Sequence, residues 1–175
     1  MKRETLTILT NDPSMTAWGY AVIRDNIVIA TGCIKTSPEQ KRRRIRAGDD
    51  RCRRISEINN CLLDIIKLYN VNYILSELPH GSQNASAAVM IGMTAGIVQT
   101  ISDVLKIGIE WYSEEDSKKC VLKKRSATKT EMVDKIKTLY KVKWTDVKYR
   151  DEAVADAIAI HYTACNQSPV LKLYK

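Results

Sequence analysis

ILTNDPSMTAWGYAVI, residues 8–23, decides the fold of this chain, because it joins two β-rich runs through an aspartate and a proline. The runs Thr5–Thr10 and Trp18–Ile23 carry the β-branched and aromatic residues typical of strands, and so does Ile27–Ile34 after a short turn. Three such segments in succession predict an antiparallel meander. Asp12 follows the first of them directly, so its side chain is expected in a cleft at the end of a strand.

Helices and strands alternate through the rest of the chain. Between Asp49 and Tyr69, apolar residues such as Ile58 and Leu62 recur at helical spacing and predict an amphipathic helix whose apolar stripe lies in the core. The segments expected after it are a strand at Val71–Ser76, a helix at Ser82–Val104, a strand at Gly108–Tyr112 and helices near Glu114–Leu122, Thr128–Tyr140 and Asp151–Cys165. This order is typical of an α/β sandwich. Because no repeat or linker is evident, residues 1–175 are expected to form one domain.

The composition indicates a partner with negative charge. The 28 Lys and Arg residues outnumber 20 Asp and Glu, for a net charge of +8, and such a surplus attracts polyanions. The longest apolar stretches, such as Ala153 to Ala164, are interrupted and fall short of the ~20 residues that span a bilayer. We therefore expect no membrane segment, no secretory signal and a cytoplasmic location, in the host cytoplasm if the source is a virus.

The cysteines do not suggest a structural site. There are five, widely spaced and without a CxxC pair, beside only two histidines. Neither a zinc site nor a disulfide framework is expected. We expect instead the small, buried, reduced side chains of an intracellular protein. These cysteines are Cys33, Cys52, Cys61, Cys120 and Cys165.

Four acidic residues stand where strands end or a helix face opens. Asp12 and Glu77 each follow or end a strand, and the carboxyl ends of parallel strands are where α/β sheets bind ligands. Glu152 and Asp156 are four apart, so both lie on one helix face, about 40° apart around the axis. Crowded carboxylates repel one another unless they share cations, and Mg²⁺ prefers oxygen ligands. Two such ions ~3.5–4 Å apart can stabilise the attacking and leaving oxygens of a phosphodiester. The pattern predicts a metal-dependent nuclease.

Three stretches of the chain, taken in their order and spacing, resemble the RuvC-type Holliday junction resolvases, particularly those of bacteriophages. They are ILTNDPSMTAWGYAVI, YILSELPHGSQNASAAVMIGMTAG at 73–96 and DEAVADAIAIHYTA at 151–164. The resemblance covers nearly the whole chain. It implies an RNase H-like fold with a five-stranded mixed sheet in the order 3-2-1-4-5, flanked by helices. It also implies a homodimer that nicks two opposing strands of a four-way DNA junction with Mg²⁺ or Mn²⁺.

The resemblance also assigns metal ligands. Those that match the family directly are Asp12, Glu77 and Asp156. Many relatives place a fourth ligand three residues before the last Asp, but this chain has Ala153 there. Glu152 and Asp151 are the two substitutes. We prefer Glu152, because five residues of helix rotate Asp151 about 140° away from Asp156.

Two lysines and one histidine carry over less directly. Lys118 and Lys129 match basic residues that face the scissile phosphate in relatives, where they can stabilise a charged transition state. Ordinary solvated lysines are the alternative. His80 stands where relatives often place an aromatic residue, so it can stack on a base, contact phosphate, or simply be a loop histidine. His161 is expected to be a packed helix residue, and Asn11, in a central strand, needs a hydrogen-bond partner.

Basic clusters flank the expected cleft. They are KRRRIR at 41–46, with Arg51, Arg53 and Arg54 nearby, and KKCVLKKR at 118–125. Such runs are often only solvated surface, but here we expect phosphate contacts that give salt-dependent DNA affinity. The candidates are Arg43, Arg44, Lys123, Lys124 and Arg125. In the helix at Ser82–Val104, small residues such as Gly92 and Gly96 are expected to allow close packing, on the sheet, across a dimer axis, or both.

Other functions remain open. A nuclease on the same fold can act on RNA/DNA hybrids or on other branched DNA, with the same carboxylates and another substrate. A non-catalytic junction-binding protein is a different class, and it would be marked by a missing carboxylate, whereas all the primary positions are filled here. An actin-like nucleotide-binding fold would need two such domains, for which the chain is too short.

Overall fold

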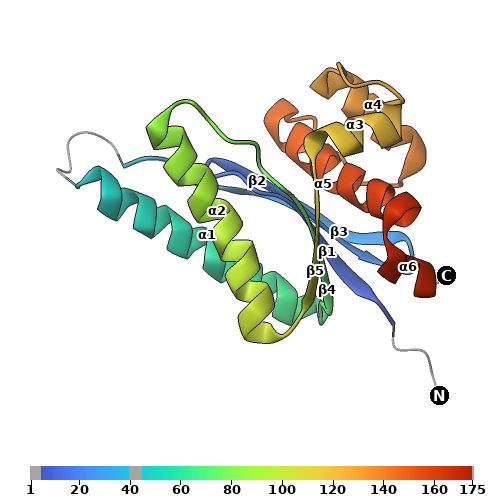
Figure 1. Cartoon of the computed structure of the whole chain (residues 1–175), viewed down its shortest axis with the longest axis horizontal. Helices are drawn as coiled ribbons and strands as arrows, with labels where there is room; N and C mark the ends of the chain where they lie inside the picture. Colours follow the sequence, from blue (N-terminus) through green and yellow to red (C-terminus); the bar gives the residue numbers. More distant parts are fainter. Residues whose placement is uncertain (1–4, 40–44, 175) are drawn as a thin grey trace.

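The computed structural model describes residues 5–39 and 45–174, which form a five-stranded sheet between two groups of helices (Figure 1). The strands are β1 (Thr7–Asp12), β2 (Ala17–Arg24), β3 (Ile27–Lys35), β4 (Tyr73–Glu77) and β5 (Gly108–Tyr112). The helices are α1 (Ala47–Tyr69), α2 (Ala85–Leu105), α3 (Glu114–Leu122), α4 (Lys129–Leu139), α5 (Lys148–Gln167) and α6 (Pro169–Leu173). In Figure 1, α1 and α2 cover one face of the sheet, and α3, α4 and α5 lie on the other.

The strand order is β3-β2-β1-β4-β5, as expected from the resemblance. The first three strands pair antiparallel and confirm the meander. β4 and β5 add parallel to β1, so the carboxyl ends of these three strands meet at one edge of the sheet. Such an edge is where ligands bind in sheets of this kind.

The core lies on both faces of the sheet. Ile58 and Leu62 of α1 are fully buried against one face, as the helical spacing predicted. On the other face α5 is apolar and buried around most of its surface, because it lies between the sheet and the helices α3 and α4. A helix buried on all sides has little amphipathic pattern. This arrangement fixes α5 directly above the strands.

Gly19 lets α5 come this close to β2. A Cβ built on Gly19 would stand 2.0 Å from the carbonyl oxygen of Ala153. No larger residue fits there without moving the helix. Gly19 is also the residue of β2 that pairs with Asp12. The close approach therefore brings the first turns of α5 beside the end of β1.

Some element boundaries differ from the prediction. β1 spans Thr7–Asp12 instead of Thr5–Thr10, because its pairing with β2 begins at Thr7 and continues to Asp12, and α5 begins at Lys148 instead of Asp151. The short helix α6 was missed: five residues show no periodicity, although Pro169 at its first position and the cap from Ser168 are helix-start signals.

Three predictions about side chains are corrected. Cys52 and Cys61 are exposed and the other three cysteines are only partly buried, although Cys165 packs against a cluster of buried residues that includes Ile160; all five are free thiols. Arg54 is 4% exposed and donates hydrogen bonds to Thr36 Oγ1 at 2.8 Å and to the Met15 carbonyl at 2.9 Å, so it ties α1 to the β1–β2 turn and does not offer a phosphate contact. Within the described residues, a Cβ on Gly92 or Gly96 would meet nothing within 4 Å, so the predicted packing of these glycines on the sheet is wrong, while packing across a dimer axis stays a prediction.

Two predictions about polar side chains are confirmed. The Asn11 Oδ1 atom accepts a hydrogen bond from Trp18 Nε1 at 3.1 Å, which supplies the partner that a central strand requires. His161 is buried in α5, and its Nδ1 lies 2.9 Å from the Tyr140 hydroxyl, as expected of a packed residue.

The surface of α2 was not anticipated. By length and composition, this is the one helix in the described part of the chain that could cross a membrane, which no segment was expected to do. Only 28% of its most apolar window is buried. Val104 is 70% exposed and Val89 49%. The described chain thus leaves one apolar helix face uncovered, and a large exposed apolar face marks an interaction surface.

Candidate active site

Three of the predicted carboxylates meet at the carboxyl edge of the sheet. Asp12 is the last residue of β1 and Glu77 the last of β4, and the residues before them, Asn11 and Ser76, are paired in register. Asp156 comes down from α5 above them. A small pocket at this edge is lined by Glu77, Glu114, Ser117, Lys118, Thr128, Lys129, Met132, Asp156 and Ala159.

The carboxyl groups raise one another's pKa. Burial, and then the charge of Asp156, raise the pKa of Asp12 to about 7. Burial, and then the charges of Asp12 and Asp156, raise the pKa of Glu77 to about 8. The pKa of Asp156 is also raised, mainly by burial. Near neutral pH this cluster therefore holds protons, or needs cations to hold its charge.

Lys129 supplies one cation. It is the first residue of α4, and its Nζ lies 3.3 Å from Asp156 Oδ2. Burial lowers the pKa of Lys129, but the charges of Asp156 and Asp12 outweigh that effect and the net pKa is raised. A capping box between Thr128 and Glu131 fixes the start of α4. The ammonium group is thus held charged within the carboxylate cluster.

The two substitutes for the fourth carboxylate point to different surroundings. Asp151 is buried, and its carboxylate accepts hydrogen bonds from Thr145 N–H at 3.0 Å, Thr145 Oγ1 at 2.7 Å and Asp146 N–H at 3.0 Å. Glu152 is partly buried, lies 4.0 Å from the Lys148 ammonium, and adds to the charges that raise the pKa of Asp156. Of the two, Glu152 is therefore the carboxylate that lies toward the cluster.

Glu114 is a site residue that the sequence reasoning missed. It lines the same pocket and begins α3. Its carboxylate lies 2.5 Å from Lys118 Nζ, and its Oε2 is 3.7 Å from His80 Nε2. The hydrogen bond with Lys118 lowers the pKa of Glu114. The negative charge of Glu114 in turn raises the pKa of Asp12 and of Glu77. The signal was available: Glu114 lies two residues beyond β5, the third strand that ends at this edge.

Comparison with known proteins assigns the family. The family model described as crossover junction endodeoxyribonuclease RuvC matches residues 8–164. This chain belongs to the RuvC family. A RuvC of Shewanella oneidensis is 27% identical over 167 residues, covering 93% of this chain and 90% of the relative. A RuvC of Shewanella frigidimarina is 28% identical over 160 residues, 89% and 87% of the two chains.

Solved structures agree on the RNase H-like fold. Thermus thermophilus RuvC in complex with a Holliday junction substrate superposes with a TM-score of 0.70 at 17% identity, over 91% of this chain and 93% of that one. The yeast mitochondrial Holliday junction resolvase Ydc2 gives 0.65 at 12% identity, over 95% and 80%. The family match confirms the resemblance to RuvC-type resolvases inferred from the sequence, and the solved structures confirm the fold.

The basic residues predicted around this RuvC site lie on and after α3. Lys118 faces Glu114, Lys124 pairs with Glu131, and Arg125 Nε lies 2.8 Å from Glu115. Lys123 caps the end of α3 in a left-handed conformation. His80 is 60% exposed in the loop after β4. Arg43 and Arg44 lie outside the described residues.

The donor set suits a hard divalent cation. Carboxylate oxygens are the ligands that Mg²⁺ takes in proteins, and those of Asp12, Glu77 and Asp156 are close enough to affect one another's pKa. Among the described residues, no three His, Cys, Asp or Glu side chains already stand in a group that could hold an ion. The chemistry of the residues fits a metal, while their side chains lie apart with Lys129 among them.

Proposed function

We propose that this chain resolves four-way DNA junctions by metal-dependent nicks in two opposing strands. The observation that carries the proposal is the carboxylate cluster at the ends of β1 and β4, beneath α5, in a basic chain of the RuvC family. The two similar solved proteins are a RuvC in complex with a Holliday junction substrate and a Holliday junction resolvase. The single domain of residues 1–175 then binds branched DNA.

The cofactor in this proposal is Mg²⁺ or Mn²⁺, with two ions in each active site. Asp12, Glu77 and Asp156 would hold them, with Glu152 as the fourth carboxylate. When bound, such ions supply an activated water and charge stabilisation at phosphorus. Lys129 and Lys118, at the rim of the same pocket, neutralise charge that develops on the scissile phosphate.

The basic residues beyond the pocket would position the junction. Lys123, Lys124 and Arg125 lie on the α3–α4 side of the site, and His80 is exposed in the loop after β4, within reach of a base or a phosphate. Arg43 and Arg44 stay candidates for the same role. Contacts of this kind fix register and orientation and do not read sequence.

Paired nicks require two active sites, so a homodimer is part of the proposal. The exposed apolar face of α2, with Gly92 and Gly96 in open space, is the surface that supports it best. Small residues allow two helices to approach closely, and burying this face removes apolar area from water. We do not assign α2 to a membrane, because it packs on the sheet beside α1. A cytoplasmic location and a bacteriophage source stay predictions.

The deciding experiment compares a synthetic four-way junction with linear duplex and an RNA/DNA hybrid, with Mg²⁺, Mn²⁺ or EDTA. We expect paired, metal-dependent nicks in opposing strands of the junction for wild type and none for Glu77→Gln. Asp64→Asn, an exposed carboxylate on α1, is the matched control and should cut like wild type. Preferential cutting of the hybrid would assign a ribonuclease H activity, and tight binding without cutting would leave a junction-binding protein.

A further inference from the structure

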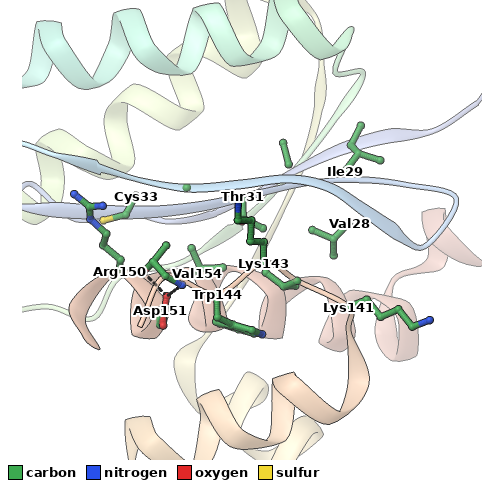
Figure 2. Close-up of a pocket in the computed structure, with 14 residues that line it drawn as sticks. Val28, Ile29, Thr31, Cys33, Lys141, Lys143, Trp144, Arg150, Asp151 and Val154 are labelled. Carbon is green, nitrogen blue, oxygen red and sulfur yellow. Dashed lines mark hydrogen bonds between the residues drawn. The ribbon is translucent and has the colours of Figure 1, made fainter. Parts of the chain in front are cut away.

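A groove of about 690 Å³ runs along the edge strand β3, on the side of α5 away from the carboxylate cluster (Figure 2). The residues 28–33 of β3 form one wall, and the segment 141–145 forms the other. Val154 and Asp151 of α5 close the base. In Figure 2, Arg150 and Cys33 lie at one end of the groove, and Lys141 and Val28 lie at the other.

The groove is cationic. Lys141, Lys143 and Arg150 line it, and its one acidic residue is Asp151. Both oxygens of the Asp151 carboxylate already accept hydrogen bonds from residues 145 and 146. The three basic side chains still outnumber this one carboxylate, so the groove has a net positive charge and attracts anions.

The groove cations differ from those near the active site. Within the described residues, Lys118, Lys124 and Arg125 each pair with a glutamate. Lys143 and Arg150 form no such ion pair there; Arg150 donates to the Tyr149 hydroxyl at 3.1 Å. Aromatic rings hold further cations nearby, with Lys35 Nζ 4.8 Å from the Tyr149 ring centroid. These groups can meet a phosphate without first breaking an ion pair.

The groove begins beside the active site. Asp12 pairs with Gly19, and Gly19 pairs with Cys33, so Cys33 stands two strands away from Asp12, roughly 10 Å. The charge of Asp12 contributes, after burial, to the raised pKa of Cys33. From Cys33 the groove follows β3 to Val28, a span of roughly 17 Å at the usual rise of a strand.

We propose that this groove binds the sugar–phosphate backbone of a junction arm next to the cut strand. The inference rests on the proposed function and adds a DNA site to it. A span of roughly 17 Å corresponds to about five nucleotides of one DNA strand. The cations along the groove would hold that arm while the scissile phosphate enters the cluster. The competing occupant is a peptide strand that pairs with the open edge of β3.

The test is the salt dependence of junction binding in EDTA. Affinity falls as salt rises. The variant Lys141→Gln/Lys143→Gln/Arg150→Gln should make the plot of log affinity against log salt less steep, by about 2 to 3 in slope, and should lower the affinity at physiological salt by roughly tenfold or more. The control Lys67→Gln/Lys106→Gln/Lys172→Gln loses the same charge at exposed positions outside the groove and should keep the wild-type slope.

The single variant Lys143→Gln is included in case the triple variant misfolds. It should make the slope less steep by about 1. The proposal would be overturned if both groove variants keep the wild-type slope, or if the control variant loses as much slope as the triple variant. The peptide strand would then be the remaining candidate for the edge of β3. Wild type and control are also assayed for junction nicking. Absent nicking would reject the proposed function, whereas nicking with an unchanged slope would reject the groove alone.

Discussion

Asp151 and Asp156 lie on the same helix, five residues apart, but their carboxylates have opposite surroundings. The buried Asp151 carboxylate accepts three hydrogen bonds from the 145–146 loop. Asp156 lies near Asp12 and Glu114, whose negative charges disfavour its ionisation. Its hydrogen-bond partner is the Lys129 ammonium group. A carboxylate that supports the fold is satisfied by donors. One kept for chemistry is left where a cation can reach it.

The sharpest test of this difference is the pair Asp156→Asn and Asp151→Asn. The first removes a proposed metal ligand, and a metal ion contributes several kcal/mol at the transition state, so cleavage should fall roughly a thousandfold or more. Junction binding in EDTA should persist. Asp151→Asn should cut within a few-fold of wild type at temperatures where it is folded. Single-turnover nicking rates measure both, and equal losses would remove the distinction between the two aspartates.

Gly19→Ala tests whether both aspartates depend on the position of α5. The added methyl group would stand 2.0 Å from the Ala153 carbonyl, so the helix must move. Overpacking of this kind destabilises by about 1–3 kcal/mol, occasionally more. Urea denaturation should show that loss, together with weakened cleavage. As a control, Gly81→Ala lies where an added Cβ meets nothing within 4 Å, and it should be neutral in stability. Wild-type stability in Gly19→Ala would mean that α5 does not approach this closely.

Asp151→Ala measures the structural side of the comparison. It leaves the N–H groups of Thr145 and Asp146 without their carboxylate acceptor. Losing the acceptor of partly buried donors should lower the free energy of unfolding by about 2 kcal/mol. Denaturant titration provides the value. A loss below a few tenths of a kcal/mol would show that water replaces the carboxylate and that the loop does not need it.

The pH dependence of stability measures the other side. The pKa of Asp12 is near 3.8 when unfolded and about 7 when folded. Its contribution therefore favours the folded state fully below pH 4 and is lost as the pH rises toward 7. Asp12→Asn removes this loss, so without divalent ions it should become more stable than wild type by on the order of 2 kcal/mol at pH 8. The two should be similar near pH 4.5. Parallel stability curves from pH 4.5 to 8 would contradict the raised pKa.

Local patterns predicted much of this fold. The β-branched runs predicted the meander, and the helical spacing around Ile58 and Leu62 predicted the core face of α1. The bounds of β1 were wrong by two residues at each end because its pairing with β2 sets them, and no local window contains that pairing. Arg54 was misassigned for a similar reason: its partners, Thr36 and the Met15 carbonyl, are distant in sequence.

The site was predictable to the extent that topology determines it. Asp12 and Glu77 follow from the rule that parallel strands end at one edge, and their proximity appears in their pKa values. The role of Glu152 as ligand stays a prediction. The groove along β3 had no sequence signal, because Arg150 and Lys143 come together with β3 only through the fold.

Glu114→Gln should have the smallest effect, and it tests whether the cluster includes a fifth carboxylate. The substitution releases Lys118 from its ion pair and removes a negative charge from the pocket that we propose faces DNA. An exposed pair of this kind contributes up to about 1 kcal/mol, so junction affinity in EDTA should rise about two- to fivefold. Asp64→Asn removes an exposed negative charge on α1, away from this pocket, and should leave affinity unchanged. A collapse of nicking in Glu114→Gln would instead make Glu114 a member of the metal-binding set, because loss of an ion pair alone does not reduce nicking by orders of magnitude.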